Sequence, residues 1–222
     1  MEENGAAIKT DGTLWMWGVN KSGVLGLNEQ GAQPQYLTAR SSPTQVGTNT
    51  NWKYIDTGTK TSFATKTDGT FWSWGYNWEG QLGHNSRTSY SSPLQVGTNT
   101  NWDRPYAMGG IFTGGAAAIK TDGTLWMWGT NNVGRLGLNN DLGPYSSPVQ
   151  VGTNTTWSQL MRAGSKYGMG AIKTDGSLWA WGANYNGELG QNNRTNYSSP
   201  MQIGTDTWNT LTSCRNDFMG LK

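Results

Sequence analysis

The segment K-T-D-G-T-L-W-M-W-G at residues 9–18 decides the fold, because close copies of it begin at Lys66, Lys120 and Lys173. Successive copies start 57, 54 and 53 residues apart. Three further phrases recur after each copy: G-x-L-G, S-S-P-x-Q-[VI]-G-T and a lone tryptophan. The lone tryptophans are Trp52, Trp102, Trp157 and Trp208. A long period that occurs four times predicts a repeat architecture, in which each repeat is one small structural unit.

Each copy predicts a β-hairpin, with strands over residues 6–9 and 14–17 joined through Asp11 and Gly12. Asp-Gly is typical of a type I′ turn, which needs a positive φ at both central residues. The outgoing strand alternates tryptophan with other mostly apolar residues, so we expect it to be covered on both faces. The S-S-P segment and the segment after the lone tryptophan add two strands. Four strands in about 53 residues are the content of a propeller blade, so we predict an all-β, four-bladed β-propeller in one domain over residues 1–222.

The composition excludes several classes of protein. Charged residues make up only 14% of the chain, against about 25% in ordinary domains, which argues against helical bundles. Sixteen Lys and Arg against fourteen Asp and Glu leave a net charge of +2, without the basic excess that nucleic-acid binding requires. One cysteine, Cys214, excludes an intrachain disulfide, and one histidine, His84, excludes a metal site built on several His or Cys ligands. We find neither a signal peptide nor an apolar run that could span a bilayer, so we expect no membrane insertion and a cytoplasmic or virion-associated protein.

The pattern D-G-[TS]-[LF]-W-x-W-G-x-N-x-x-G-x-L-G followed by P-x-Q-[VI] resembles the repeat of the regulator of chromosome condensation family of β-propellers. The resemblance covers nearly the whole chain, four times over. It implies a rigid disc whose loops contact another macromolecule. The family includes a nucleotide-exchange factor for a small GTPase, inhibitors of β-lactamases and many bacterial and phage proteins. Its best-known members carry about seven repeats, and the Asn- and Thr-rich variant seen here looks most like the bacterial and phage members.

The two ends of the sequence raise the question of ring closure. Trp208 precedes Lys222 by 14 residues, as Trp52 precedes Lys66, so the last strand is equivalent to the first one. We divide the repeats at approximately 5–51, 52–101, 102–156 and 157–207, with 208–222 as closing strands that complete the first blade. We therefore expect a four-bladed ring closed by strand exchange between the termini. The alternatives are an open arc, which could form a homo-oligomer through its open blade edges, and a part of a larger propeller.

Segments outside the repeat pattern are the candidates for binding, because the repeated residues are needed to build blades. The first linker between G-x-L-G and S-S-P is about seven residues longer than its counterparts and contains Gln35 and Tyr36. The interval from Trp102 to Lys120 is 18 residues long, against 14 from Trp52 to Lys66, and we interpret its start as a longer loop. This loop contains Arg104 and Tyr106, and the one tryptophan outside the pattern is Trp78. These residue types are enriched in the hot spots of protein interfaces.

A second set of candidates would suit a glycan, since propeller lectins bind one sugar per blade with an aromatic ring and nearby amides. Two kinds of residue recur at equivalent positions: the tyrosines before S-S-P and the asparagines after W-G. They are Tyr90, Tyr145, Tyr197, Asn77, Asn131 and Asn184. Arg40 takes the place of the tyrosine in the first repeat and breaks the pattern.

The sequence thus predicts a non-enzymatic binding or scaffold module without catalytic residues, metal or cofactor. No nucleophile and base can be paired around His84, and no phosphate-binding glycine loop occurs. We expect a bacterial or phage structural or surface-appendage protein whose partner is another protein or a surface glycan, and which binds no nucleic acid. The alternatives are a multivalent glycan-binding propeller and a regulator of a small GTPase.

Overall fold

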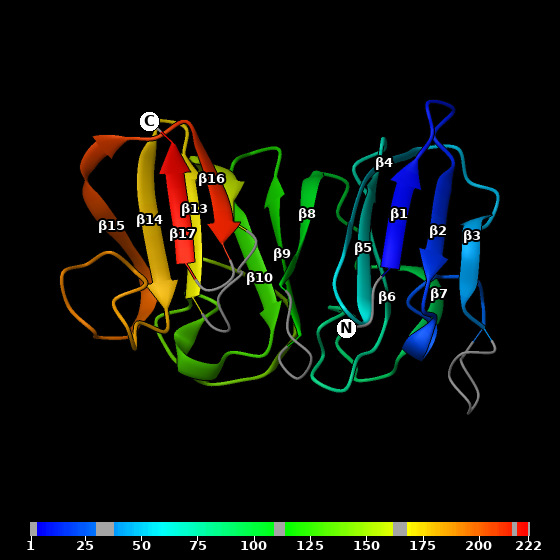
Figure 1. The fold of residues 1–222 in the computed structure, drawn as a ribbon, viewed down its shortest axis with the longest axis horizontal. Coiled ribbons are helices and arrows are strands. Elements are labelled where there is room, and N and C mark those ends of the chain that lie inside the picture. The colour runs from blue at the N-terminus through cyan, green and yellow to red at the C-terminus, as the bar shows by residue number, and fades with distance from the viewer. Residues whose placement is uncertain (1–3, 30–37, 109–113, 162–167, 215–216, 222) are drawn as a thin grey trace.

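The computed structural model describes residues 4–29, 38–108, 114–161, 168–214 and 217–221, and it is built almost entirely of β-strands (Figure 1). The first sheet has three strands and the next three sheets have four each. In chain order the strands of these four sheets are β1 (Asn4–Ile8), β2 (Leu14–Gly18) and β3 (Arg40–Gln45); β4 (Trp52–Thr57), β5 (Thr61–Lys66), β6 (Phe71–Gly75) and β7 (Tyr90–Gln95); β8 (Trp102–Met108), β9 (Gly115–Lys120), β10 (Leu125–Gly129) and β11 (Tyr145–Gln150); and β12 (Trp157–Leu160), β13 (Gly168–Lys173), β14 (Ser177–Gly182) and β15 (Tyr197–Thr207).

A fifth, two-stranded sheet follows, made of β16 (Thr210–Cys214) and β17 (Asp217–Leu221). The described part of the chain contains two short 3-10 helices, η1 (Lys21–Gly23) and η2 (Asn132–Gly134). None of its helices has the length and apolar character needed to cross a bilayer. Strands that follow one another within a blade pair antiparallel. The predicted all-β fold of four propeller blades is therefore confirmed.

The predicted closure by strand exchange is not seen. β16 pairs with β17 instead of β1, and its first residue, Thr210, lies opposite Leu221. Figure 1 shows the first sheet at the right of the molecule and the fifth sheet at the left, where β16 packs beside β12 and β13. Between them the blades follow one another as an arc, in which β4 of one blade packs beside β8 of the next.

The Asp-Gly hairpin is confirmed, but its turn differs from the predicted type. Gly12 has a φ of +78°, whereas Asp11 is not among the residues with a positive φ. The Asp11 carboxylate instead accepts hydrogen bonds from the Thr13 amide at 2.9 Å and the Thr13 hydroxyl at 2.6 Å. This is the geometry of a three-residue loop that ends on a left-handed glycine. A side chain at Gly12 would also collide with the Thr50 carbonyl, so glycine is required twice over.

The core lies between the blades, where one tryptophan of the outgoing strand in the second, third and fourth blades docks on the preceding blade. The indole Nε1–H of Trp74 donates to the Val24 carbonyl at 2.8 Å, and the Trp74 ring has no exposed surface. Gly26, the second glycine of G-V-L-G, lies against this ring, since a Cβ there would be 2.8 Å from Nε1. The two equivalent contacts join Trp128 to the Gln81 carbonyl and Trp181 to the Arg135 carbonyl, each at 2.9 Å. W-x-W-G and G-x-L-G are thus the two halves of one inter-blade contact.

Trp17 departs from the burial that its place in the repeat predicts. Its ring is half-buried, whereas the equivalent Trp74 is fully buried. The reason is its place in the first sheet: the described residues provide no preceding blade whose carbonyl could receive the indole.

Removal of a docked tryptophan is expected to destabilise the protein strongly. Trp128→Ala would leave a large cavity and an unpaired buried carbonyl at Gln81, at a cost of about 3–5 kcal/mol in the free energy of unfolding. Trp17→Ala serves as the matched control and should cost clearly less, because its ring is already partly solvated. Urea unfolding followed by circular dichroism measures both. Equal losses would show that inter-blade docking is not what Trp128 contributes.

Candidate functional site

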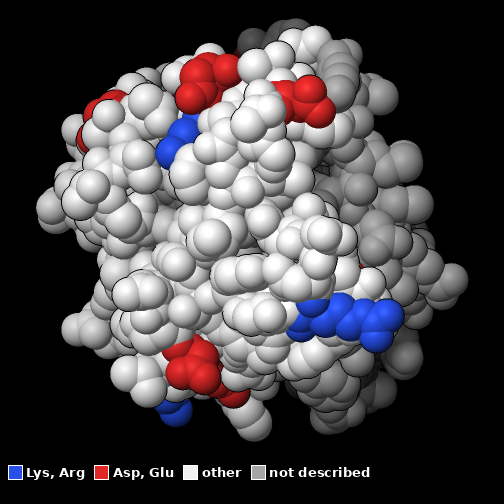
Figure 2. All heavy atoms as spheres, turned by 90° about the vertical axis from the view of Figure 1, so that its left-hand side faces the viewer, with Lys and Arg blue, Asp and Glu red and all other residues white. Residues whose placement is uncertain are grey.

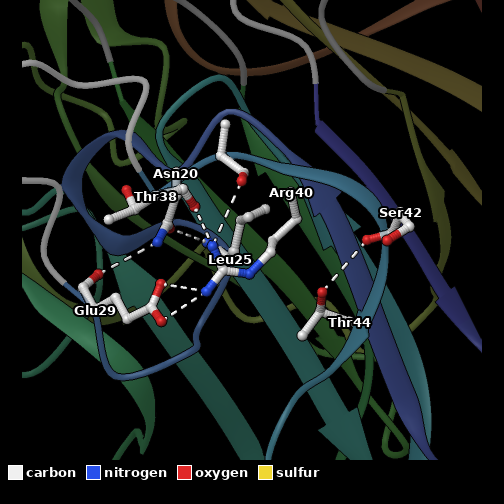
Figure 3. A network of polar contacts seen from close by, with 8 residues as sticks. Asn20, Leu25, Glu29, Thr38, Arg40, Ser42 and Thr44 are labelled. Atoms are coloured by element: carbon white, nitrogen blue, oxygen red, sulfur yellow. Dashed lines mark hydrogen bonds and ion pairs between the residues drawn. The ribbon is translucent and has the colours of Figure 1, made fainter.

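The loops that follow the W-G ends of the outgoing strands are each organised by one asparagine. Asn20 shows the arrangement in Figure 3: its Oδ1 accepts the Leu25 amide at 3.0 Å, and its Nδ2 donates to the Glu29 carbonyl at 3.4 Å. In the other blades the side-chain Nδ2 of the equivalent asparagine donates to two carbonyls of the loop that follows, as Asn131 does to the carbonyls of Asn140 and Leu142. The side chains of all four asparagines are buried. They hold the loops in shape without reaching the surface.

This burial removes the amides on which a glycan site would depend. Asn77, Asn131 and Asn184 use their side chains for backbone hydrogen bonds inside the loops. The tyrosines before S-S-P are half-buried and have partners of their own. The Tyr145 hydroxyl donates to Asn140 Oδ1 at 3.2 Å, the Tyr197 hydroxyl accepts from Asn193 Nδ2 at 2.9 Å, and the Tyr90 ring packs edge-on against His84. These residues are parts of the loop framework.

The residue after the organising asparagine, in contrast, is exposed in the second, third and fourth blades. In the second and fourth blades it is aromatic: Trp78 is 68% exposed and Tyr185 is 56% exposed. In the third blade Leu142, whose carbonyl is held by the organising Asn131, is 69% exposed. These loops follow strands that run in the same direction around the arc, as β2 and β14 do toward the lower edge of Figure 1. We call the surface that carries Trp78, Leu142 and Tyr185 the loop face.

Trp78 packs on a second aromatic ring, that of Tyr76. Its indole stacks on Tyr76 with ring centroids 5.5 Å apart and an interplanar angle of 28°. On the same tyrosine, the Lys60 ammonium lies 5.2 Å from the ring centroid. The Tyr76 amide also donates to the Lys60 carbonyl at 2.9 Å, which fixes this loop to the β4–β5 turn. The site therefore presents a large apolar surface on a rigid base.

Two other predicted site residues, Arg104 and Tyr106, prove to lie on strand β8, and not on a loop. The interpretation of residues 103–108 as a longer loop was wrong, because the inner strand continues from Trp102 to Met108. Arg104 packs over the Tyr54 ring of the preceding blade at 4.8 Å, and its hydrogen bond to Tyr54 raises the pKa of the guanidinium. Tyr106 is buried, and this burial raises the pKa of its phenol. Tyr106 is thus a contact within the fold, whereas Arg104 contacts Tyr54 and is still exposed.

The remaining two, Gln35 and Tyr36, lie outside the described residues. The residues on either side of this segment are described, and an ion pair joins them. Arg40 Nη2 lies 2.7 Å from Glu29 Oε1 and 2.8 Å from Glu29 Oε2 (Figure 3). Arg40 lies opposite Gly18, as Tyr90 lies opposite Gly75, so the two residues are equivalent. The arginine that replaces tyrosine in the first repeat thus forms the ion pair that joins the two sides of residues 30–37.

Sequence reasoning singled out the exposed Trp78 because it broke the pattern, but it did not single out the exposed Tyr185 and Leu142. Tyr185 could have been found by aligning the residue after the asparagine across the repeats, where Lys21, Trp78, Asn132 and Tyr185 are equivalent. Leu142 carries no such signal, since its exposure depends on how the 138–144 loop is folded.

The described residues include one contact between a serine and the histidine. Ser73 Oγ lies 2.9 Å from His84 Nε2, but Ser73 is fully buried and donates its hydroxyl proton to the Leu82 carbonyl at 2.7 Å. A substrate could not reach it. No group of three or more His, Cys, Asp or Glu side chains gathers among the described residues. A cavity of about 340 Å³ between the third and fourth blades is lined by Tyr145, Trp157 and Trp179 and by uncharged residues.

Charge is sparse on the surface as well. Figure 2 shows the outer side of the C-terminal blade, where most of the surface is uncharged and the acidic and basic side chains form small separate groups. This side offers no continuous basic area for a phosphate backbone.

With the geometry described, the comparison with known proteins gives the family. The "Regulator of chromosome condensation (RCC1) repeat" matches residues 11–65, 68–105, 122–170 and 175–214. The chain belongs to the RCC1 repeat family. The resemblance expected from the sequence is confirmed.

Relatives of this RCC1-repeat chain include two proteins of Arabidopsis thaliana. Over 206 aligned residues it is 32% identical to the RCC1 domain-containing protein RUG3, mitochondrial. This alignment covers 89% of the chain and 44% of RUG3. It is 28% identical over 191 residues to the ultraviolet-B receptor UVR8, covering 85% of the chain and 41% of the receptor. The chain thus spans less than half the length of these relatives. Their plant origin, and the animal origin of the related RCC2 proteins, give no support to the expected bacterial or phage source.

Solved structures show the same fold at low sequence identity. The crystal structure of human WBSCR16 superimposes with a TM-score of 0.81 at 18% identity, covering 98% of the chain and 56% of that protein. Prp20p from Saccharomyces cerevisiae gives a TM-score of 0.79 at 17% identity, covering 99% of the chain and 54% of Prp20p. The arc therefore corresponds to about half of each of these propellers.

The organising asparagines provide a direct test of the loop framework. Asn131→Ala would leave the Leu136 amide and two loop carbonyls without their partner, and we expect it to lower the free energy of unfolding by about 1–3 kcal/mol. The neighbouring, exposed Asn132→Ala is the control and should change it by less than about 0.5 kcal/mol. Chemical denaturation of the two variants measures the difference, and a neutral Asn131→Ala would contradict the framework role.

The half-buried His84 predicts a pH dependence of stability. Burial lowers the pKa of His84 below its ordinary value of 6.5, so the unfolded chain takes up a proton at a higher pH than the folded chain does. The free energy of unfolding should therefore fall as the pH drops through 6.5, and level off below the folded-state pKa. His84→Leu, which introduces the residue found at the equivalent Leu27 and Leu138, should remove this dependence. Urea unfolding between about pH 5 and about pH 7.5 tests it, and an unchanged slope in the variant would exclude His84 as its source.

Proposed function

We propose that this RCC1-repeat chain is a non-enzymatic binding module that docks another protein on its loop face. The single observation that carries the proposal is Trp78, 68% exposed and stacked on Tyr76. A large aromatic ring in water is unfavourable unless it is buried part of the time, and the repeat itself does not need it, since Lys21 and Asn132 occupy its place in other blades.

The form of the loop face also fits a protein partner. Trp78, Leu142 and Tyr185 lie on three successive blades, so they are spread over a broad surface and do not line one pocket. Exposed aromatic anchors on a fixed backbone lose little conformational entropy on binding, and Trp and Tyr are enriched in interface hot spots. The buried asparagines keep each anchor in place by fixing its loop.

The solved relatives support a protein as the partner. The structure of Prp20p was described together with its binding to Gsp1p and histones, and yeast RCC1 (Prp20) has been crystallised bound to Kap60. These are properties of Prp20, which is about twice as long as the aligned chain. They support for this chain the general role of a propeller that binds proteins.

Regulation of a small GTPase is the second candidate, and the binding of Prp20p to Gsp1p favours it. The resemblance to a family that includes a nucleotide-exchange factor points the same way. Release of a fluorescent guanine nucleotide from Gsp1p, with and without the chain, tests this candidate. An unchanged release rate would contradict regulation and leave binding as the function.

The loop face is tested by truncating its anchor. Trp78→Ala should weaken binding of the chain to immobilised Gsp1p or histones by about 2 kcal/mol, or roughly 30-fold, while the melting temperature stays nearly unchanged. Biolayer interferometry measures the affinity and thermal unfolding measures the stability.

The matched control is Met201→Ala, which truncates an apolar side chain that is 38% exposed on the outer strand β15, away from the loop face. It should leave binding unchanged. Equal effects of the two variants would place the site elsewhere, and failure of the intact chain to bind either protein would count against both as partners.

A further inference from the structure

The cavity of about 340 Å³ lies between two four-stranded sheets, those of the third and fourth blades. The third blade contributes Tyr145 and Val149 on β11, and the fourth contributes Trp157 on β12, Trp179 on β14 and Pro200 on β15. The volume falls within the range of about 300–1,000 Å³ that is usual for ligand sites. Its walls are therefore formed by whole blades in the middle of the arc and not by the edges at its ends.

The aromatic wall of this cavity contains a buried donor without an acceptor. The rings of Trp157 and Trp179 pack edge to face, with centroids 6.0 Å apart and an interplanar angle of 76°. Trp179 Nε1–H donates to the Ser177 hydroxyl at 2.9 Å, and the Tyr145 hydroxyl also has a partner. Trp157 is 2% exposed, and its Nε1–H has no hydrogen-bond partner among the described residues. A buried donor left unpaired is unfavourable, so an acceptor on a bound ligand would stabilise it.

Two polar side chains in a more exposed part of the wall, Asn139 and Ser199, are also available to a ligand. At the other two junctions the equivalent serine and asparagine bond each other: Ser92 Oγ to Asn28 Oδ1 at 3.1 Å, and Ser147 Oγ to Asn85 Oδ1 at 3.3 Å. No such bond joins Asn139 and Ser199 in the described structure. The third junction thus leaves unused the side-chain groups that the others spend on each other.

The charge of the lining also sets this junction apart. The inner-strand tryptophans of the other junctions have the same unpartnered N–H, so this donor does not by itself distinguish the third one. In the first blade, however, Arg40 takes the place of Tyr145 and is ion-paired to Glu29. In the second blade the ionisable His84 takes the place of Leu138. At the third junction every lining residue is uncharged, which favours a neutral ligand.

We propose that this cavity binds a proline-rich segment of another protein. The Trp157 Nε1–H donates to the carbonyl of a residue that precedes a proline, and the pyrrolidine ring packs on the aromatic wall. The wall offers a buried donor, so the ligand must bring an acceptor there. A hydroxyl or an ordinary peptide group would bring an O–H or N–H into the same apolar wall, whereas a carbonyl bonded to a proline nitrogen brings neither.

The conformation of a proline-rich chain fits the rest of the cavity. Such a chain forms a polyproline II helix without internal hydrogen bonds, so its carbonyls are free to accept. The Asn139 amide and the Ser199 hydroxyl would donate to these carbonyls beside the aromatic wall. Because the helix is already formed before binding, little conformational entropy is lost, and aromatic-lined grooves are the general binding sites for such chains.

This inference is separate from the proposed function of the loop face, because Trp78, Leu142 and Tyr185 do not line the cavity. Trp78→Ala should therefore leave the binding of a proline-rich peptide unchanged, and a failure of one proposal would not decide the other.

The experiment titrates the full 222-residue chain with a synthetic peptide of about ten prolines in a calorimeter. The peptide should reach half-saturation below about 1 mM, and a glycine–serine peptide of the same length, which lacks the rings and keeps its N–H groups, should not bind. Trp157→Phe keeps an aromatic ring but removes the donor, and it should weaken binding at least about tenfold.

Trp102→Phe is the matched control, because Trp102 is also 2% exposed, begins the equivalent strand β8 and has the same unpartnered N–H. It should lower the melting temperature by a similar amount and leave peptide binding unchanged. A second pair places a charge at equivalent positions of two outer strands. Val149→Asp should abolish binding because Val149 lines the cavity, whereas Leu94→Asp on β7 should not alter it.

Absence of binding at about 1 mM peptide would overturn the proposal. So would equal affinity for the glycine–serine peptide, since proline would then not be recognised. Equal losses in Trp157→Phe and Trp102→Phe would exclude the third junction as the site. Binding of a neutral oligosaccharide such as maltotriose in place of the peptide would assign the cavity to a glycan instead.

Discussion

A buried hydrogen bond from a tryptophan indole to the backbone of the preceding blade is the contact on which the structure depends. The Trp74 ring can be fully buried only because its one polar group, Nε1–H, finds the Val24 carbonyl. The carbonyl is accessible only because Gly26 has no side chain. Each blade thus supplies an indole to one neighbour and a glycine-lined carbonyl to the other, and a blade by itself would leave both unsatisfied.

This division of labour also explains where binding residues can be found. Most of the repeated residues are used in turns, in loop frameworks or in contacts between blades, as the buried Asn77 and the Asp11 carboxylate show. Variation is tolerated where a side chain leaves the framework, directly after the organising asparagine. There the chain places lysine, tryptophan, asparagine or tyrosine, and the hydrogen bond from the leucine amide to the organising asparagine is kept in all four loops. The binding residues that we propose therefore lie where the repeat does not determine the side chain.

Sequence reasoning singled out one residue that the structure shows to be exposed, Trp78, and it assigned two strand residues to a loop, both for physical reasons. Trp78 was identifiable because every other tryptophan had a structural place. Arg104 and Tyr106 were assigned to a loop because the interval containing them is long, yet a longer interval does not show where the additional residues are inserted. The inner strand runs through both residues, which places Tyr106 in the interior and leaves Arg104 exposed beside the Tyr54 ring.

The sequence by itself determined the fold, the hairpins, the blade contents and the family, because these follow from local turn chemistry and from a spacing repeated four times. Only the tertiary structure decided that Asp11 accepts hydrogen bonds within the turn, that the amide of Asn131 is buried and that β16 pairs with β17 instead of β1. The pairing of β16 shows the physical reason. Equivalent segments such as residues 5–9 and 218–222 have the same local preferences, so the choice between them depends on which neighbours the rest of the chain brings within reach.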